Sequence, residues 1–338
     1  MVKTMRERTA REDIEKKQLF SIIKKVPEAA LFSHDFPDGD CLGSMLALGL
    51  ALEGMGKKVC YYNAGPFPKN LKFLPGFEKI SSTIKEKLPE TLIYIDCADQ
   101  GRTAGIIGLE DLVVDKQVIN IDHHVSNDYF GSLNWVDSEA AATGEMIFAL
   151  LKELGVRISE EIATNLYSAI ITDTGRFSYS NTNPGSFKIA AELVETGIDL
   201  VKINNILFEQ KTLPQIRLLH KALSNLRLNQ EGSIALITLS QKDFSEIGAD
   251  ENASEGLVNY ARNIENVEAA VLFKELEGNQ IKVSFRSNSW LDVNKIAVEF
   301  GGGGHIRASG CTINAPLAEA VEIVVSTLEE ALKLGRNH

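Results

Sequence analysis

The sequence lacks any apolar run of about 18 or more residues, the length that a membrane-spanning helix requires. Residues 1–18 are polar and of mixed charge, so they do not resemble a basic stub followed by an apolar stretch. A secretory signal would need that order. We therefore expect a cytoplasmic protein with no membrane partner.

Cysteine is also scarce. The chain has 4 cysteines in 338 residues, widely separated and without a CxxC pair. Such spacing argues against a disulfide framework and against a structural zinc site. Small buried thiols in a reducing compartment are the simplest interpretation.

Positive charge is in the minority, with 35 Lys and Arg against 46 Asp and Glu and a formal net charge of −11. Proteins that hold long nucleic acid through its backbone usually carry a basic face. The acidic balance therefore argues against a long duplex partner. It leaves small nucleotides open, because bound divalent cations supply positive charge locally.

The composition, 44% hydrophobic and 24% charged, is typical of a globular protein, and the length allows two domains. In the first half, short apolar runs alternate with helical patterns, which predicts an α/β fold with a mainly parallel sheet flanked by helices. Ligands of such sheets lie beyond the carboxyl ends of the strands. The expected strands are 29–33, 58–62, 92–95 and 118–121, and the expected helices are 41–55, 142–154 and 160–171.

The second half has the pattern of a smaller α/β domain. We expect a domain of residues 1–190 that carries the chemistry, a helical linker of residues 191–213, and a second domain of residues 214–338. The elements expected beyond the linker are a strand at 234–239, a helix at 254–264, a hairpin of 269–273 with 282–285, and helices at 292–300 and 316–334.

Acidic and imidazole side chains follow apolar segments at four places in the first half. Each place has an ordinary interpretation, such as a capping turn or a strand-terminating acid. Their combination favours a site for two divalent ions about 3.5–4 Å apart, which needs several ligands and usually a shared carboxylate. The residues of this predicted site are His34, Asp38, Asp40, Asp96, His123 and Asp173.

Two of these places carry further arguments. Asp173 ends an apolar helix, where the helix dipole disfavours a carboxylate unless a cation lies nearby. Asp122-His123-His124 closes a strand, and neighbouring strand residues face opposite sides. We therefore expect only one of the two histidines to contact an ion directly.

These motifs resemble, in order, those of the DHH phosphoesterases. The matching elements are the His34-Asp35-Phe36-Pro37-Asp38-Gly39-Asp40 turn, the lone Asp96, the Asp122-His123-His124 triplet and Asp173. In the second half, Gly301 to His305 and Phe285-Arg286-Ser287 resemble the substrate-binding motifs of the domain that accompanies DHH in the nanoRNase/pAp phosphatase branch. The resemblance covers nearly the whole chain. Cys41 stands where a small residue such as Ala is usual, and Cys97 follows the lone Asp, neither of them at a ligand position.

The resemblance implies a residue-by-residue site. One ion, expected to be manganese, would be held by His34, Asp38 and Asp96, and the other by Asp40, Asp96, His123 and Asp173. Asp96 would bridge the ions and take part in catalysis, with His124 beside it orienting phosphate or assisting the leaving group. Substrate would lie in a cleft between the domains, bound by Arg102, Arg262, Arg286, Ser287, Gly302, Gly303, Gly304 and His305. The ordinary interpretations are a solvated loop for Arg102, a surface charge for Arg262 and a flexible hinge for the glycines.

The expected activity is metal-dependent hydrolysis of very short oligoribonucleotides, together with dephosphorylation of adenosine 3′,5′-bisphosphate (pAp) to AMP. The alternative within the same chemistry is a phosphodiesterase for cyclic-di-AMP or pApA. From another class, the chain could be a nucleotide-binding regulator without catalysis. A long-DNA exonuclease and a type II inorganic pyrophosphatase fit less well, and we expect a homodimer.

Overall fold

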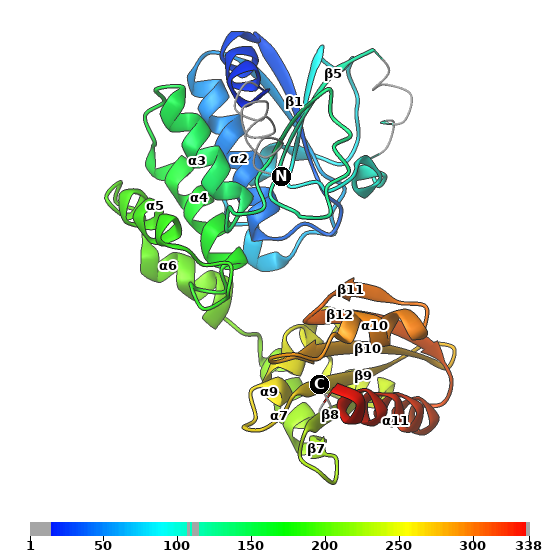
Figure 1. Cartoon of the computed structure of the whole chain (residues 1–338). Coiled ribbons are helices and arrows are strands. Elements are labelled where there is room, and N and C mark those ends of the chain that lie inside the picture. The colour runs from blue at the N-terminus through cyan, green and yellow to red at the C-terminus, as the bar shows by residue number, and fades with distance from the viewer. Residues whose placement is uncertain (1–14, 107–108, 110–114, 336–338) are drawn as a thin grey trace. The chain divides into compact units, whose positions relative to one another are not determined.

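The computed structural model describes residues 15–106, 109 and 115–335, which form two compact units divided after Gln210. The first contains a parallel sheet of six strands in the order β3-β2-β1-β4-β5-β6 (Figure 1). Its strands are β1 (Glu28–Ser33), β2 (Lys58–Tyr62), β3 (Ile80–Ser81), β4 (Thr91–Ile95), β5 (Gln117–Asp122) and β6 (Leu133–Val136). The mainly parallel α/β fold expected from the sequence is confirmed. The sequence analysis did not predict strands β3 and β6.

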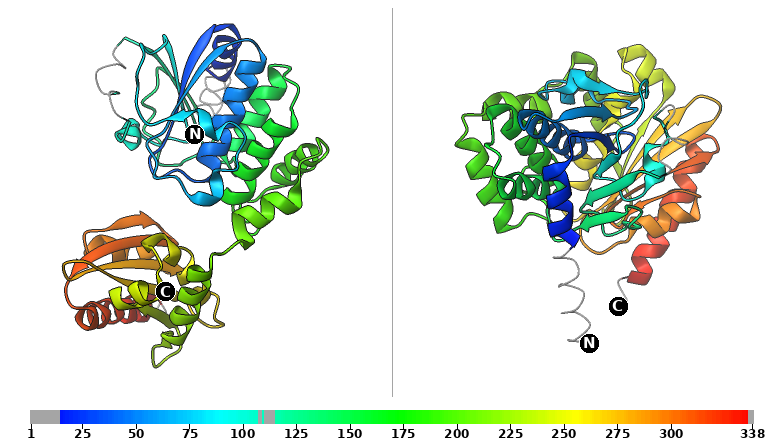
Figure 2. Two further views of the ribbon diagram at one scale, coloured as in Figure 1. Left: turned by 180° about the vertical axis from the view of Figure 1, so that it is seen from behind. Right: turned by 90° about the horizontal axis from the view of Figure 1, so that it is seen from above.

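Both faces of this sheet are buried, each against its own core. Successive strand residues point to opposite sides and so join different cores. On β1, Ala29 and Leu31 join a core with the helices, whereas Ala30 and Phe32 join a smaller core on the other face. The helices on the first face pack side by side, as Figures 1 and 2 show. They are α2 (Gly39–Gly54), α3 (Thr143–Glu153) and α4 (Glu160–Asp173).

The stretch expected as a linker is divided between the two units. Its residues up to Gln210 belong to the first unit, where Leu193, Ile203 and Leu207 are buried in the helix-side core. These apolar side chains hold the segment against the unit. Its elements are α5 (Pro184–Val194), α6 (Leu200–Asn204) and a π-helical turn, Asn205–Glu209.

The second unit has a mixed six-stranded sheet in the order β11-β12-β10-β9-β8-β7, antiparallel except for the β8–β9 pair. Alternate residues of β9 face different cores on its two sides. The expected hairpin is β9 with β10, and the expected helix at 254–264 is shorter in the structure. The strands are β7 (Arg227–Leu228), β8 (Ile234–Leu239), β9 (Ala269–Leu276), β10 (Gln280–Ser287), β11 (Gly303–His305) and β12 (Ala308–Asn314). The helices are α7 (Leu213–Ser224), α8 (Gln241–Ile247), α9 (Leu257–Arg262), α10 (Val293–Glu299) and α11 (Leu317–Gly335).

Short 3-10 helices complete the two units: Lys69–Leu71, Phe77–Lys79, Gln100–Thr103 and Glu251–Ser254. Residues 15–25 are helical as well, and Leu19 and Ile23 are buried in the helix-side core. Within the described residues, every helix is too short or too polar to cross a lipid bilayer.

Candidate metal centre

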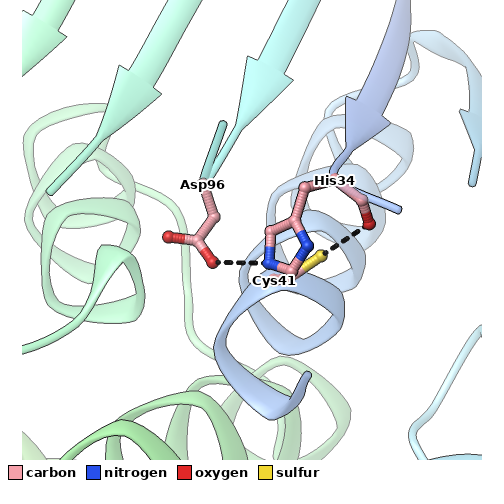
Figure 3. Close-up of side chains that lie close together, drawn as sticks. All are labelled: His34, Cys41 and Asp96. Carbon is pink, nitrogen blue, oxygen red and sulfur yellow. Dashed lines mark hydrogen bonds and ion pairs between the residues drawn. The ribbon is translucent and has the colours of Figure 1, made fainter. Parts of the chain in front are cut away.

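The order of the first sheet reverses between β1 and β4, and in doubly wound sheets ligands bind where the order reverses. His34 directly follows β1 and Asp96 directly follows β4. The Nε2 atom of His34 lies 3.5 Å from Oδ2 of Asp96 (Figure 3). Asp96 has a φ of +60°, in the left-handed region that residues other than glycine seldom adopt. Such conformations cluster at functional sites.

His123 lies at the centre of a second group, just beyond β5. Its Nε2 atom faces three carboxylates at nearly equal distances. They are Asp40 at 3.7 Å, Asp96 at 3.7 Å and Asp173 at 3.6 Å. These distances are too long for hydrogen bonds but suit atoms that share one ion through bonds of about 2.0–2.2 Å. The Nδ1 atom is 3.2 Å from the carbonyl oxygen of Ala140, which directs Nε2 toward the carboxylates.

Asp40 is fixed by the beginning of α3. The backbone N–H groups of Thr143 and Gly144 donate to its two oxygens at 2.7 and 2.9 Å. The residue before this helix, Ala142, makes no side-chain cap, so the Asp40 carboxylate satisfies these donors instead. The hydroxyl of Thr143 also donates to Oδ1 of Asp96 at 2.8 Å. Thr143 therefore positions both carboxylates, a role that the sequence analysis missed.

Asp173 reaches the group because α4 packs very closely on α2. A Cβ atom at Gly39 would lie 2.3 Å from the hydroxyl oxygen of Thr172, and one at Gly43 would lie 2.5 Å from the carbonyl oxygen of Asn165. The glycines, spaced four residues apart, lie on one face of α2. They allow the last turn of α4 to come within ligand distance of Asp40.

His124 is held by the first member of its own triplet. Its Nδ1 atom hydrogen-bonds to Oδ1 of Asp122 at 2.7 Å, and the other oxygen of this buried carboxylate accepts from the Asn127 amide at 2.6 Å. The Nδ1 atom also lies 3.7 Å from Oδ1 of Asp96. Both histidine rings therefore lie beside Asp96. β5 ends at Asp122 and the histidines follow it, so strand alternation does not apply to them, and direct ion contact by only one of the two stays a prediction.

The electrostatics indicate a site that attracts cations. Burial and the charge of Asp96 raise the pKa of Asp173 to about 7. Burial also raises the pKa of Asp40, and Asp96 adds to this effect. Although burial opposes it, the charges of Asp40 and Asp96 raise the pKa of His123 to about 9. Protons thus compensate a cluster of buried negative charge that divalent ions would compensate equally well.

The remaining predicted ligand, Asp38, lies at the solvent side of the cluster. Its side chain is 59% exposed, with Oδ1 4.0 Å from Nε2 of His34. The same oxygen accepts from the backbone N–H of Cys41 and so caps α2. Nearby, Phe36 is 77% exposed and has a φ of +56°. An exposed aromatic ring two residues from both His34 and Asp38 is available for stacking on a nucleobase.

The structure thus brings the six predicted ligands together at one edge of the sheet. Three groups of side chains offer atoms within 4.8 Å of one another. The groups are His34 with Cys41 and Asp96, Asp96 with His123 and His124, and Asp40 with His123 and Asp173. Asp96 belongs to two of them, which suits a carboxylate shared by two ions. The donor set therefore fits a pair of divalent ions.

Arg102 is exposed on the 3-10 helix Gln100–Thr103 and belongs to the first unit. Among the second-unit residues, Ser287 is buried, and its hydroxyl donates to the carbonyl oxygen of Leu291 at 2.7 Å rather than facing a ligand. Arg286 donates to the carbonyl oxygen of Phe285. The half-buried Arg262 lies on α9, where it donates to its neighbour Asn263 at 3.4 Å.

Gly303 and Gly304 of the glycine run belong to the edge strand β11. Gly303–His305 pairs with β12 on one side. A Cβ atom at Gly302 would lie 2.1 Å from the carbonyl oxygen of Gly310, and Gly304 has a φ of +146°, so both positions favour glycine. His305 is exposed at the end of this strand.

Comparison with known proteins finds relatives over nearly the whole chain. The model of the DHH family N-terminal domain matches residues 28–170, and that of the DHHA1 domain matches residues 233–334. The chain is 36% identical to a bifunctional oligoribonuclease and PAP phosphatase NrnA of Thermus thermophilus, over 94% of this chain and 95% of that protein. The chain belongs to the DHH family.

Other DHH relatives cover nearly the same length. A protein of the same name from Bacillus subtilis is 30% identical over 88% of this chain and 93% of its own. Among solved structures, an exopolyphosphatase-related protein from Bacteroides fragilis has a TM-score of 0.86 at 27% identity, covering 95% of this chain and 96% of that one. The family resemblance and the two-domain α/β fold drawn from the sequence are confirmed. DHH phosphoesterases depend on metal ions, and the three groups described above could hold them.

Proposed function

We propose that this chain is a two-metal phosphoesterase that degrades very short oligoribonucleotides and converts pAp to AMP. The observation that carries the proposal is the ring of three carboxylates at 3.6–3.7 Å around His123. Its DHH relatives at 36% and 30% identity, both named bifunctional oligoribonuclease and PAP phosphatase, support the choice of substrates.

In this proposal His34, Asp38 and Asp96 would hold one ion, and Asp40, Asp96, His123 and Asp173 would hold the other. Oxygen-rich ligands with imidazole suit Mn²⁺, which we take as the physiological ion. Two such ions would supply positive charge to the phosphoryl oxygens and activate water near neutral pH.

The protein's own groups position the reaction. Because Nδ1 of His124 is engaged by Asp122, its Nε2 atom is the one that faces substrate, where it orients the phosphate or protonates the leaving oxygen. Thr143 keeps the Asp96 carboxylate in one orientation. Arg102, Arg262, Arg286, His305 and the glycine strand would bind the rest of the nucleotide, with arginine suited to bidentate phosphate contacts.

A turnover assay on short oligoribonucleotides, pAp, cyclic-di-AMP and pApA, run side by side with Mn²⁺ and then with EDTA, tests the proposal. We expect the first two substrates to be favoured and EDTA to stop turnover of all of them. Preference for the cyclic dinucleotide or pApA would instead support the alternative phosphodiesterase. Nucleotide binding with no product under either condition would indicate a regulator.

The role of the second unit has its own test. Arg286→Ala should raise KM for pAp strongly while hydrolysis of a simple aryl phosphate stays nearly intact, because the small substrate does not use this unit. The matched control is Arg227→Ala. Arg227 is an exposed arginine on β7, the edge strand opposite to β11. Equal losses on both substrates would contradict the division of labour. The homodimer and the cytoplasmic location stay predictions, the first of them testable by light scattering.

A further inference from the structure

Cys41 lies among the proposed ligands of one ion, although the family resemblance assigns it no role. Its Sγ atom, a ring nitrogen of His34 and a carboxylate oxygen of Asp96 all lie within 4.8 Å of one another (Figure 3). All three residues are buried, with Cys41 fully inaccessible to solvent. A thiol, an imidazole and a carboxylate at this spacing are three common ligands of a borderline or soft divalent ion.

Cys41 is held by one backbone and one side-chain contact. Its backbone N–H donates to Oδ1 of Asp38 at 3.0 Å, and its thiol donates to the carbonyl oxygen of His34 with Sγ 3.8 Å away. Cys41 is in the first turn of α2, whose close packing against α4 was described above. Its short side chain therefore has little freedom to move away from the group.

The separations suit one shared ion. With bonds of about 2.3 Å to sulfur and about 2.0–2.1 Å to nitrogen, any two ligands of a tetrahedral ion lie about 3.5 Å apart. The Nε2 atom of His34 and Oδ2 of Asp96 already have this separation, 3.5 Å, and Sγ of Cys41 lies within 4.8 Å of both groups. Cys97 offers a comparison: it is equally buried and directly follows Asp96, but its Sγ contacts the carbonyl oxygen of Ile95 and it packs in the core on the other face.

We propose that Cys41 is a direct thiolate ligand of the ion held by His34 and Asp96. On binding, the sulfur–metal bond replaces the S–H bond and the proton passes to solvent, so no oxidant or reductant is needed. A thiolate gives this position a higher affinity for softer ions such as Co²⁺, Zn²⁺ and Cd²⁺, relative to Mn²⁺, than the oxygen-rich position around His123 has. The inference rests on the metal centre of the proposed function. It makes the two ion positions chemically different, one with a thiolate ligand and one without.

Absorption spectroscopy of the full chain titrated with Co²⁺ under reducing conditions tests the metal centre and the thiolate ligand separately. Bound Co²⁺ gives visible d–d bands whatever its ligands, whereas a near-ultraviolet charge-transfer band requires a thiolate. We expect both in the wild type, loss of the near-ultraviolet band alone in Cys41→Ser, and no loss in Cys60→Ser, a half-buried cysteine on β2.

The possible results are distinct. Visible bands without a near-ultraviolet band in the wild type, or a near-ultraviolet band that survives in Cys41→Ser, would overturn the ligand role and leave the metal centre standing. Absence of both bands would remove the metal centre and this inference with it.

A second measurement does not depend on the serine variant folding. The ¹¹³Cd NMR resonance of the wild type should lie in the downfield range of sulfur ligation, and a shift in the range of oxygen and nitrogen ligands would contradict the proposal. In Cys41→Ala, the affinity for Cd²⁺ relative to Mn²⁺ should fall about tenfold or more, which is at least roughly 1.4 kcal/mol. An unchanged ratio would equally overturn it.

Discussion

Removal of divalent ions should make the protein progressively less stable as the pH rises, and Asp173 is the main reason. Its pKa is raised from 3.8 to about 7 in the folded chain. Between these values the folded state binds a proton that the unfolded state has lost, so stability falls as the pH rises through about 7. His123, with its pKa raised from 6.5 to about 9, acts in the same direction, because its extra stability is lost as the pH rises through about 9.

The magnitude follows from the pKa of Asp173. At about 1.4 kcal/mol for each tenfold change, its rise corresponds to a loss on the order of 4 kcal/mol. Asp173 and His123 influence each other's pKa, so their contributions do not simply add. A domain of this size shifts its Tm by about 2–4 °C per kcal/mol. We therefore expect the metal-free Tm to fall by roughly 10 °C between about pH 4 and about pH 7, the interval between the two pKa values of Asp173.

Excess Mn²⁺ should oppose this trend, because the ion replaces the protons and binds better where it need not compete with them. A ligand at about 100 times its Kd stabilises by about 2.7 kcal/mol. Scanning calorimetry in EDTA and in Mn²⁺ across this pH range measures both curves. The Mn²⁺-dependent rise in Tm should increase with pH.

Two variants make the test specific. Asp173→Asn removes the titrating carboxyl and should flatten the metal-free curve, whereas Glu195→Gln, an exposed acid at the end of α5, should leave it unchanged. A metal-free Tm that is constant or rises with pH, or an Asp173→Asn curve that follows the wild type, would refute the assignment of the cation site to these groups.

Three further changes probe how the site is built. Thr143→Val removes the hydroxyl that donates to Asp96, so Mn²⁺ affinity measured by calorimetry should fall by about tenfold or more, whereas Thr143→Ser should retain it. Asp122→Ala frees the His124 ring and should lower kcat by about 10–100-fold, with KM for pAp little changed; unaltered kcat would show that the ring needs no such support. Gly43→Ala forces a methyl group against the backbone of α4 and should cost about 1–3 kcal/mol of unfolding free energy and weaken Mn²⁺ binding. Gly54→Ala, in the same helix but with open space around it, is the control and should be neutral or stabilising by up to about 1 kcal/mol.

The sequence predicted elements well where the pattern is local and apolar. β1 and β4 are buried, nearly continuous apolar runs, and β5 contains a shorter apolar stretch, Val118-Ile119. The acidic or imidazole residue that ends or follows each strand is adjacent to it in the chain. β11 and β12 were missed because their residues are mostly small or polar, and pairing with neighbouring strands stabilises them rather than any pattern of their own.

By itself, the sequence therefore determined the fold class, the family and the residues available as ligands, because these depend on periodicity and on short motifs. Only the tertiary structure decided which atoms meet. The Thr143 hydroxyl donates to Asp96, which is 47 residues away in the sequence, and glycines in α2 set how near Asp173 comes to Asp40. Such contacts arise from helix packing and backbone geometry between distant segments, which no local pattern encodes.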